Sequence, residues 1–158
     1  MEWEQNKAYL KGTLSSPQTH PSKVAAFDLD GTLVVTKTGR RFPADKDDWK
    51  FFSPKVPKEL KKLNSRFQLV ILSNQGGLRK KTAKLEEWKE KIELIFCPLG
   101  LPLLVFASLE DDKYRKPRTG FWDEFLPSAD REKSFYCGDA AGRVALGKVG
   151  KDFDDTDY

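Results

Sequence analysis

Two aspartates lie two residues apart, directly after a short apolar segment. The segment is Val24–Phe27, and residues 28–33 behind it read DLDGTL. A run of this kind is typical of a buried parallel strand, and the Gly-Thr pair is typical of the turn that ends one. The pattern therefore places Asp28 and Asp30 at the carboxyl edge of a sheet, where open α/β sheets bind their ligands.

Carboxylates in this position are suited to metal and phosphorus chemistry. Two of them repel each other unless a cation or a shared proton relieves the repulsion, and their hard oxygen atoms suit Mg²⁺. One carboxylate can attack phosphorus to form an acyl phosphate, while a second can protonate the leaving oxygen and then deprotonate a water molecule. For the pair alone, an acidic turn without chemistry is the other interpretation.

Chemically useful side chains also follow three further apolar segments. They are Ser73 after residues 69–72, Lys116 after residues 102–107 and Asp139 after residues 134–137. Because parallel strands end at one edge of their sheet, we expect these side chains and the two aspartates to form a single site.

Each of these side chains has a predicted task in phosphoryl transfer. Ser73, with the backbone N–H groups of Asn74 and Gln75, is expected to hold phosphate oxygens at a helix start. Lys116 would neutralise charge on the phosphoryl group, and Asp139 would complete the metal site. Taken singly, a helix cap, a loop lysine and a turn residue are the other interpretations.

Between the strand segments, apolar residues recur with helical spacing. The spacing is found at residues 56–63 and 85–95, and a shorter helix is expected at 121–126. Strands that alternate with helices predict an α/β fold with a parallel sheet flanked by helices. The chain divides into a lead-in segment, residues 1–22, and one domain, residues 23–158, because the mixed N-terminal part ends in a polar, proline-bearing stretch.

The loop at residues 35–54 is polar and basic and too short to hold a large cap domain. The formal net charge of the whole chain is +4, which is too mild to establish a nucleic-acid partner by itself. Basic residues nevertheless cluster behind the predicted strands, at residues 37–41, 79–84 and 113–118. An anionic substrate at the sheet edge would meet positive potential from several sides. Solvated surface charge is the other interpretation.

Cysteine usage and hydropathy indicate the compartment. Cys97 and Cys137 lie in or beside apolar stretches without CxxC spacing. We expect buried free thiols in a reducing compartment rather than a disulfide or a zinc site. No apolar run approaches membrane-spanning length, so we expect an intracellular, soluble protein without a membrane partner.

The order of these motifs resembles the haloacid dehalogenase superfamily of phosphohydrolases. Within this superfamily, the sequence resembles most specifically the DNA 3′-phosphatase of the polynucleotide kinase/phosphatase family, over roughly residues 23–158. The strings that carry the resemblance are FDLDGTL, TKTGRRFP followed by DW, SNQ, YRKPRTGFWD and GDAAGR. It implies a Rossmann-like haloacid dehalogenase fold without a large cap. It also implies Mg²⁺ as cofactor and removal of 3′-phosphates from DNA single-stranded ends, nicks or gaps, by a monomer that repairs DNA in the nucleus.

Position by position, the resemblance assigns roles to particular residues. Asp28 would be the nucleophile and Asp30 the general acid/base. The Asp28 carboxylate, the Asp30 backbone carbonyl and Asp139 would bind Mg²⁺. Ser73 and Lys116 would hold the phosphate. The expected substrate-binding residues are Thr32, Phe42, Asn74, Arg115 and Arg143.

Phe42 lies in the segment that resembles the family's flap. An aromatic side chain on a basic loop is suited to stacking on a base near a DNA 3′ end. A core contact that anchors the loop is the other interpretation of this residue.

Two departures from the family pattern bear on function. No GxxxxGK[ST] phosphate-binding loop occurs, so this chain does not supply a 5′-kinase half. In the family, the motif at residues 151–158 continues into further strand and helix, which leaves a shortened protein or a fragment as alternatives. Two other functions therefore stay open: a phosphatase for small phosphorylated metabolites, and a non-catalytic DNA-end-binding remnant. The absence of a cap insertion favours the polymeric substrate.

Overall fold

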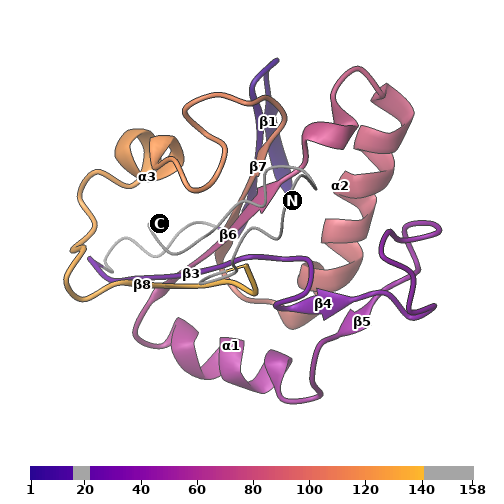
Figure 1. The fold of residues 1–158 in the computed structure, drawn as a ribbon. Coiled ribbons are helices and arrows are strands. Elements are labelled where there is room, and N and C mark those ends of the chain that lie inside the picture. The colour runs from indigo at the N-terminus through magenta and orange to yellow at the C-terminus, as the bar shows by residue number, and fades with distance from the viewer. Residues whose placement is uncertain (16–21, 141–158) are drawn as a thin grey trace.

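A six-stranded sheet forms the centre of the computed structural model, which describes residues 1–15 and 22–140. The strand order is β1-β2-β7-β6-β3-β8 (Figure 1). Four neighbouring strands run parallel, namely β7 (Leu103–Ser108), β6 (Gln68–Asn74), β3 (Val24–Phe27) and β8 (Phe135–Cys137). This parallel core agrees with the α/β fold expected from the alternating strand and helix segments.

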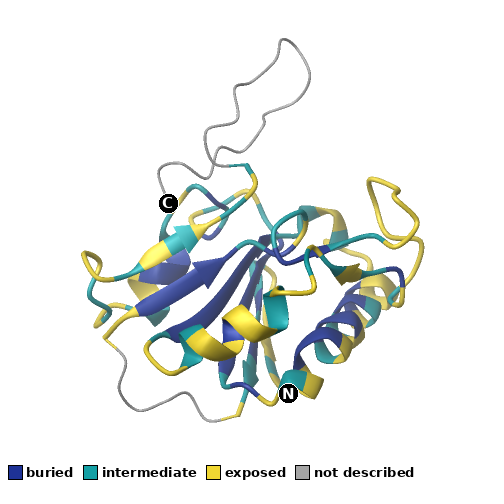
Figure 2. Ribbon diagram, turned by 90° about the horizontal axis from the view of Figure 1, so that it is seen from below, coloured by how far each residue is buried: buried dark blue, intermediate teal, exposed yellow. Residues whose placement is uncertain are grey.

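Helices cover both faces of the parallel core. On one face, α1 (Val56–Asn64) and α2 (Thr82–Phe96) pack against alternate strand residues such as Ala25 and Ile71. On the other face, α3 (Gly120–Phe125) packs against the intervening residues such as Ala26. Figure 1 shows α3 on the opposite side of the sheet from α1 and α2, and Figure 2 shows the central strands as the most buried elements. Because both faces are covered, the strands are apolar throughout rather than alternating.

The N-terminal segment contributes to the sheet itself. β1 (Glu2–Gln5) and β2 (Tyr9–Leu14) form a hairpin, and β2 pairs antiparallel with β7 from Tyr9 opposite Ser108 to Leu14 opposite Leu103. The sequence predicted only a lead-in segment here, so these two strands were missed. The hairpin covers the edge of β7 that would otherwise expose unpaired backbone groups.

Between β3 and α1 the chain forms a small excursion instead of a simple loop. Its base is a two-stranded ribbon of β4 (Val34–Val35) and β5 (Lys50–Phe51), with Val34 opposite Phe51. We call residues 36–49, between these two strands, the flap. The structure thus confirms that no large cap lies at this position, and it adds a ribbon that the sequence did not predict.

Short helices and the cysteines complete the described chain. The 3₁₀-helices η1 (Gly76–Leu78) and η2 (Cys97–Leu99) precede and follow α2.

Cys97 and Cys137 are both exposed free thiols, so their predicted burial was wrong. Cys97 begins η2, beyond the buried face of α2, and Cys137 ends β8, the last strand of the described sheet.

The core contact of the hairpin provides a stability test. Leu10 in β2 has no exposed surface and belongs to the core on the α1 and α2 face. Leu10→Ala should therefore lower the free energy of unfolding by about 2–5 kcal/mol, as for other buried leucines. Urea unfolding followed by circular dichroism measures this. Lys7→Ala, in the exposed hairpin turn, should change the same quantity by less than about 0.5 kcal/mol. Equal, small effects would mean that the hairpin is not an integral part of the fold.

Candidate active site at the carboxyl edge of the sheet

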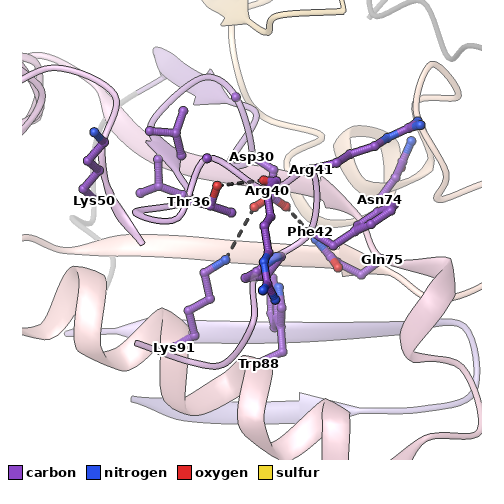
Figure 3. A pocket seen from close by; sticks show the side chains of 15 residues that line it. Asp30, Thr36, Arg40, Arg41, Phe42, Lys50, Asn74, Gln75, Trp88 and Lys91 are labelled. Atoms are coloured by element: carbon purple, nitrogen blue, oxygen red, sulfur yellow. Dashed lines mark hydrogen bonds and ion pairs between the residues drawn. The ribbon is translucent and has the colours of Figure 1, made fainter. Parts of the chain in front are cut away.

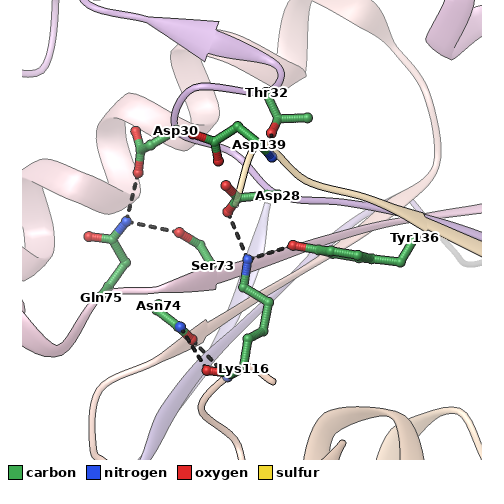
Figure 4. Close-up of polar contacts among 9 residues, drawn as sticks. All are labelled: Asp28, Asp30, Thr32, Ser73, Asn74, Gln75, Lys116, Tyr136 and Asp139. Carbon is green, nitrogen blue, oxygen red and sulfur yellow. Dashed lines mark hydrogen bonds and ion pairs between the residues drawn. The ribbon is translucent and has the colours of Figure 1, made fainter. Parts of the chain in front are cut away.

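A buried ion pair lies at the centre of the strand ends. Lys116 Nζ is 2.9 Å from Asp28 Oδ1, and the two side chains are 4% and 13% exposed. Lys116 Nζ also donates to the hydroxyl of Tyr136 in β8, at 2.7 Å (Figure 4). Asp28 follows β3 directly, and its backbone N–H donates to Cys137 O at 2.9 Å. Two neighbouring strands and the loop behind β7 therefore converge on one carboxylate.

Asn74, the last residue of β6, holds the backbone of Lys116 in place. Its Oδ1 accepts the Lys116 N–H at 3.0 Å, and its Nδ2 donates to Lys116 O at 3.2 Å. Asn74 was expected to bind substrate, but its side chain here binds this backbone. The loop is anchored further by buried Tyr114, whose hydroxyl donates to Glu124 Oε2 at 2.6 Å and whose ring lies 4.8 Å from that of Phe121. These contacts explain how a lysine can be 3% exposed at the sheet edge.

The side chain of Gln75 connects Asp30 with Ser73. Gln75 Nε2 donates to Asp30 Oδ2 at 3.0 Å and to Ser73 Oγ at 2.9 Å (Figure 4). The Gln75 backbone N–H donates to Ser108 O at 2.8 Å, so the prediction that this N–H holds phosphate was wrong. The helix start expected behind Ser73 is the short 3₁₀-helix η1, which begins at Gly76 after β6 ends at Asn74, while α2 begins only at Thr82.

Asp139 reaches the same edge from β8. Its backbone N–H donates to Thr32 Oγ1 at 3.0 Å, which ties the turn behind β8 to the turn behind β3. A Cβ atom on Gly31 would lie 2.6 Å from Asp139 Oδ2. Gly31 also has a φ of 83°, which glycine adopts more readily than other residues. Glycine here lets the Asp139 carboxylate approach the Asp28–Asp30 turn.

The donor set at this edge fits Mg²⁺. Asp28 and Asp139 supply carboxylates, and the backbone between Asp28 and Gly31 supplies carbonyls. Mg²⁺ in proteins commonly uses one or two carboxylates and keeps several water molecules. Among residues 1–15 and 22–140, no group of three or more His, Cys, Asp or Glu side chains has the spacing of a metal site. Any such ion would therefore depend on backbone and water oxygens as well as on these two carboxylates.

The structure brings most of the predicted site residues together. The aspartates, Ser73, Lys116 and Asp139 lie within the hydrogen-bonded cluster of Figure 4, where Thr32 positions Asp139. Arg115 lies beside Gly76, with its Nη1 3.3 Å from where a Cβ on Gly76 would be, and burial lowers the pKa of its guanidinium. Arg143 lies outside the described residues.

A cleft of about 620 Å³ opens beside this cluster, under the flap (Figure 3). Asp30 and Gln75 line it on the side of the cluster, and Phe42 lines it from the flap. The Phe42 side chain is largely exposed, and the Arg41 guanidinium lies 5.5 Å from the centre of its ring. The structure therefore does not support the interpretation of Phe42 as a core contact that anchors the loop.

Sequence reasoning missed Lys91 in α2, whose side chain is only 6% exposed and lies 3.6 Å from Asp30 Oδ1. It also lines the cleft. The signal was present in the sequence, because Lys91 falls within the apolar stripe of this helix, three residues after Trp88 and four before Ile95. A lysine on the buried face of an amphipathic helix is unusual enough to mark a candidate site.

These features define a class of protein. The fold resembles that of a putative haloacid dehalogenase-like phosphatase from Mesorhizobium loti, with a TM-score of 0.69 and 17% sequence identity over 86% of this chain and 72% of that one. The fold is therefore that of the haloacid dehalogenase-like phosphatases, as the resemblance of the sequence motifs implied.

The sequence narrows this class to a family. A model of the family described as polynucleotide kinase 3 phosphatase matches residues 23–158, and the chain belongs to this family. A bifunctional polynucleotide phosphatase/kinase of Schizosaccharomyces pombe is 46% identical over 126 residues, which cover 77% of this chain and 31% of that protein. The chain thus spans about a third of this relative's length.

Two further relatives are matched over most of their own length. An uncharacterized 20.8 kDa protein of Autographa californica nuclear polyhedrosis virus is 40% identical over 139 residues, which cover 86% of this chain and 76% of that protein. A polynucleotide 3′-phosphatase of Saccharomyces cerevisiae is 28% identical over 213 residues, which cover 94% of this chain and 87% of that protein.

Asp48 organises the flap. Its carboxylate accepts the Thr38 N–H at 3.0 Å, the Thr38 hydroxyl at 2.8 Å and the Ala44 N–H at 2.9 Å. The Ala44 N–H does most to lower the pKa of Asp48, Thr38 adds to this, and burial opposes it; the resulting pKa is about 2. An unfolded aspartate titrates near pH 3.9. The stabilisation of the flap is therefore complete above about pH 4 and is lost as the pH falls through 2.

Hydrogen exchange tests this role of Asp48. After correction for intrinsic rates, the Thr38 and Ala44 amides should be protected at pH 5 and lose their protection between pH 4 and 2. Asp48→Asn should remove most of that protection at pH 7, because an amide cannot accept as a carboxylate does. Asp47→Asn, an exposed neighbour in the flap, should leave it unchanged. Protection that survives Asp48→Asn would contradict the assignment.

Proposed function

We propose that this protein is a Mg²⁺-dependent polynucleotide 3′-phosphatase that removes 3′-phosphates at DNA strand breaks. The observation that carries the proposal is the buried Lys116–Asp28 pair next to Asp30 and Ser73, in a chain of this family. A partly buried carboxylate fixed beside an ammonium is a positioned nucleophile, and the same ammonium can stabilise charge on a phosphoryl group.

In the first step, the Asp28 carboxylate attacks the phosphorus of the 3′-phosphate. A bond forms between the Asp28 oxygen and phosphorus while the bond from phosphorus to O3′ breaks. Asp30 gives its proton to O3′, so that DNA leaves with a 3′-hydroxyl and Asp28 carries the phosphoryl group. Lys116 and Ser73 hold the oxygens of this group.

In the second step, Asp30 acts as a base. It takes a proton from a water molecule, whose oxygen attacks the phosphorus of phospho-Asp28. The bond between the Asp28 oxygen and phosphorus breaks, inorganic phosphate leaves and both aspartates return to their initial states. The access to water that a general base requires fits Asp30, whose side chain is 52% exposed, better than Asp28, whose side chain is 13% exposed.

Mg²⁺ would be held by the Asp28 carboxylate, the Asp30 backbone carbonyl and Asp139. When bound, it supplies positive charge that offsets the repulsion among carboxylates and phosphate. The substrate comes from the relatives, among which proteins of Saccharomyces cerevisiae and Arabidopsis thaliana are named polynucleotide 3′-phosphatases. The open cleft under a short flap supports a polymeric substrate rather than an enclosed metabolite.

The proposal extends to the cellular setting. A DNA-repair role implies action on DNA ends in the nucleus, and a single copy of the site suffices for the steps above, so we propose a monomer. Among the residues that the structure describes, no helix is long and apolar enough to cross a membrane.

Phosphate release from a 3′-phosphorylated oligonucleotide tests the function. Asp28→Asn should lower kcat at least about a thousandfold because it removes the nucleophile, while Glu59→Gln, which removes one exposed carboxylate from α1, should leave it unchanged. EDTA should abolish turnover and added Mg²⁺ should restore it. Faster turnover of small phosphate esters than of the oligonucleotide would favour the metabolite phosphatase. Binding of the oligonucleotide without turnover would favour the DNA-end-binding remnant.

Gly31 offers a separate test of the metal site. Gly31→Ala pushes a methyl group against the Asp139 carboxylate and should raise the Mg²⁺ concentration for half-maximal activity by about tenfold or more. Gly100→Ala is the matched control, because Gly100 has a φ of 64° but no heavy atom within 4 Å of the added Cβ. Equal Mg²⁺ requirements in the two variants would remove Asp139 from the metal site.

A further inference from the structure

The side chain of Lys91 is largely buried, and its ammonium has no close protein partner among the described residues. The side chain is 6% exposed, and the ion pair that these residues offer it is with Asp30 Oδ1 at 3.6 Å, which is too long for a hydrogen bond. No hydrogen-bond acceptor for it is found within the described parts of the chain. Burial of an ammonium is costly unless its N–H groups are satisfied. Lys91 therefore has hydrogen-bonding capacity that the protein leaves unused.

Lys91 points into the cleft under the flap. It is among the residues that line the cleft, and Figure 3 shows its side chain extending from α2 towards Asp30. Trp88, one helical turn earlier, lines the same cleft, but its Nε1 is buried and so offers no accessible donor there. The ammonium of Lys91 is therefore the donor on this helix that a ligand with an acceptor can reach.

The charge around the cleft defines that acceptor. Asp30 is the only acidic residue that lines it among those described, whereas four lining residues are basic: Arg40, Arg41, Lys50 and Lys91. This surplus of positive charge favours an anion over a neutral acceptor such as a base carbonyl. A phosphate group also matches the number of donors offered, because its oxygens accept several hydrogen bonds.

We propose that Lys91 binds the internucleotide phosphodiester immediately 5′ of the terminal nucleoside. This inference rests on the proposed function, in which Asp30 protonates O3′. Since Lys91 lies next to Asp30, it faces the terminal nucleoside rather than the 3′-phosphate itself. The next anion along the strand is this phosphodiester. Lys91 thereby distinguishes the end of a polynucleotide from a mononucleotide, and it determines specificity rather than chemistry.

A neutral linkage tests the contact without altering the protein. In a 3′-phosphorylated oligonucleotide, a methylphosphonate at the last internucleotide linkage removes the charge and nearly preserves the shape. With the wild-type protein it should raise KM on the order of 10- to 100-fold, the effect of one lost charge-assisted hydrogen bond, with kcat little changed. A methylphosphonate several linkages further along the strand is the control substrate and should have little effect.

A double-mutant cycle combines a variant of Lys91 with the methylphosphonate substrate. Lys91→Met should raise KM for the unmodified oligonucleotide by a similar factor and should become insensitive to the methylphosphonate. Lys61→Met removes an exposed lysine from α1 and should keep the wild-type sensitivity. Thermal unfolding should show that Lys91→Met is folded.

Other results would overturn the inference. If Lys91 only orients Asp30, Lys91→Met lowers kcat equally for both substrates, and the methylphosphonate leaves the wild-type KM unchanged. Binding of both oligonucleotides to Asp28→Asn, by fluorescence anisotropy, separates this inference from the proposed function. If the wild-type protein shows no turnover but the methylphosphonate weakens binding, the phosphatase is contradicted and the contact is supported. If the wild-type protein turns the oligonucleotide over but the methylphosphonate does not weaken binding, the contact is contradicted and the phosphatase is not.

Discussion

The ion pair between Lys116 and Asp28 is the interaction on which the site depends. A lysine that is 3% exposed is stable only if its charge is matched, and here the match comes from Asp28 at 2.9 Å and the Tyr136 hydroxyl at 2.7 Å. Those partners follow β3 and lie in β8, while Asn74 at the end of β6 holds the lysine backbone. Correct register of three neighbouring strands is therefore a condition for burying this charge. The same register places Ser73 and Asp139 at the edge.

Three carboxylates lie at this edge, and each residue meets a different partner. Asp28 pairs with an ammonium, Asp30 accepts from an amide, and the backbone N–H of Asp139 donates to a threonine hydroxyl. Each contact fixes a position, and the ammonium also offsets the charge of Asp28. For the proposed reaction, such a site is preorganised for a phosphate dianion and a divalent cation, because its groups are oriented before either arrives.

The regular elements were predictable because their signals are local. Val24–Phe27 is apolar at every position, so a strand buried on both faces follows from four residues. The hairpin at Glu2–Leu14 was missed because its pattern is diluted by charged residues and by Gly12, and because its burial depends on β7, about ninety residues further along the chain. Lys91 was missed for a related reason: its importance depends on the distant Asp30, which helix periodicity does not reveal.

Under the proposed function, the flap and the cleft explain how a small haloacid dehalogenase-like domain suits a chain-like substrate. A ribbon of two-residue strands replaces a cap domain, so the cleft stays open at its side, and a polymer can leave the site without a domain having to move. An open cleft does not enclose its substrate as a cap domain would. Selectivity must therefore come from charged side chains at defined distances from the reacting phosphate. The Asp48 carboxylate fixes the backbone at both ends of the segment that carries Arg40, Arg41 and Phe42. Lys91 supplies the opposite wall from a rigid helix, where its burial prevents it from following a ligand that binds elsewhere. If Lys91 binds a phosphodiester as proposed, a fixed cation in one wall and a hydrogen-bonded basic flap in the other together select for a strand that continues beyond its terminal nucleotide.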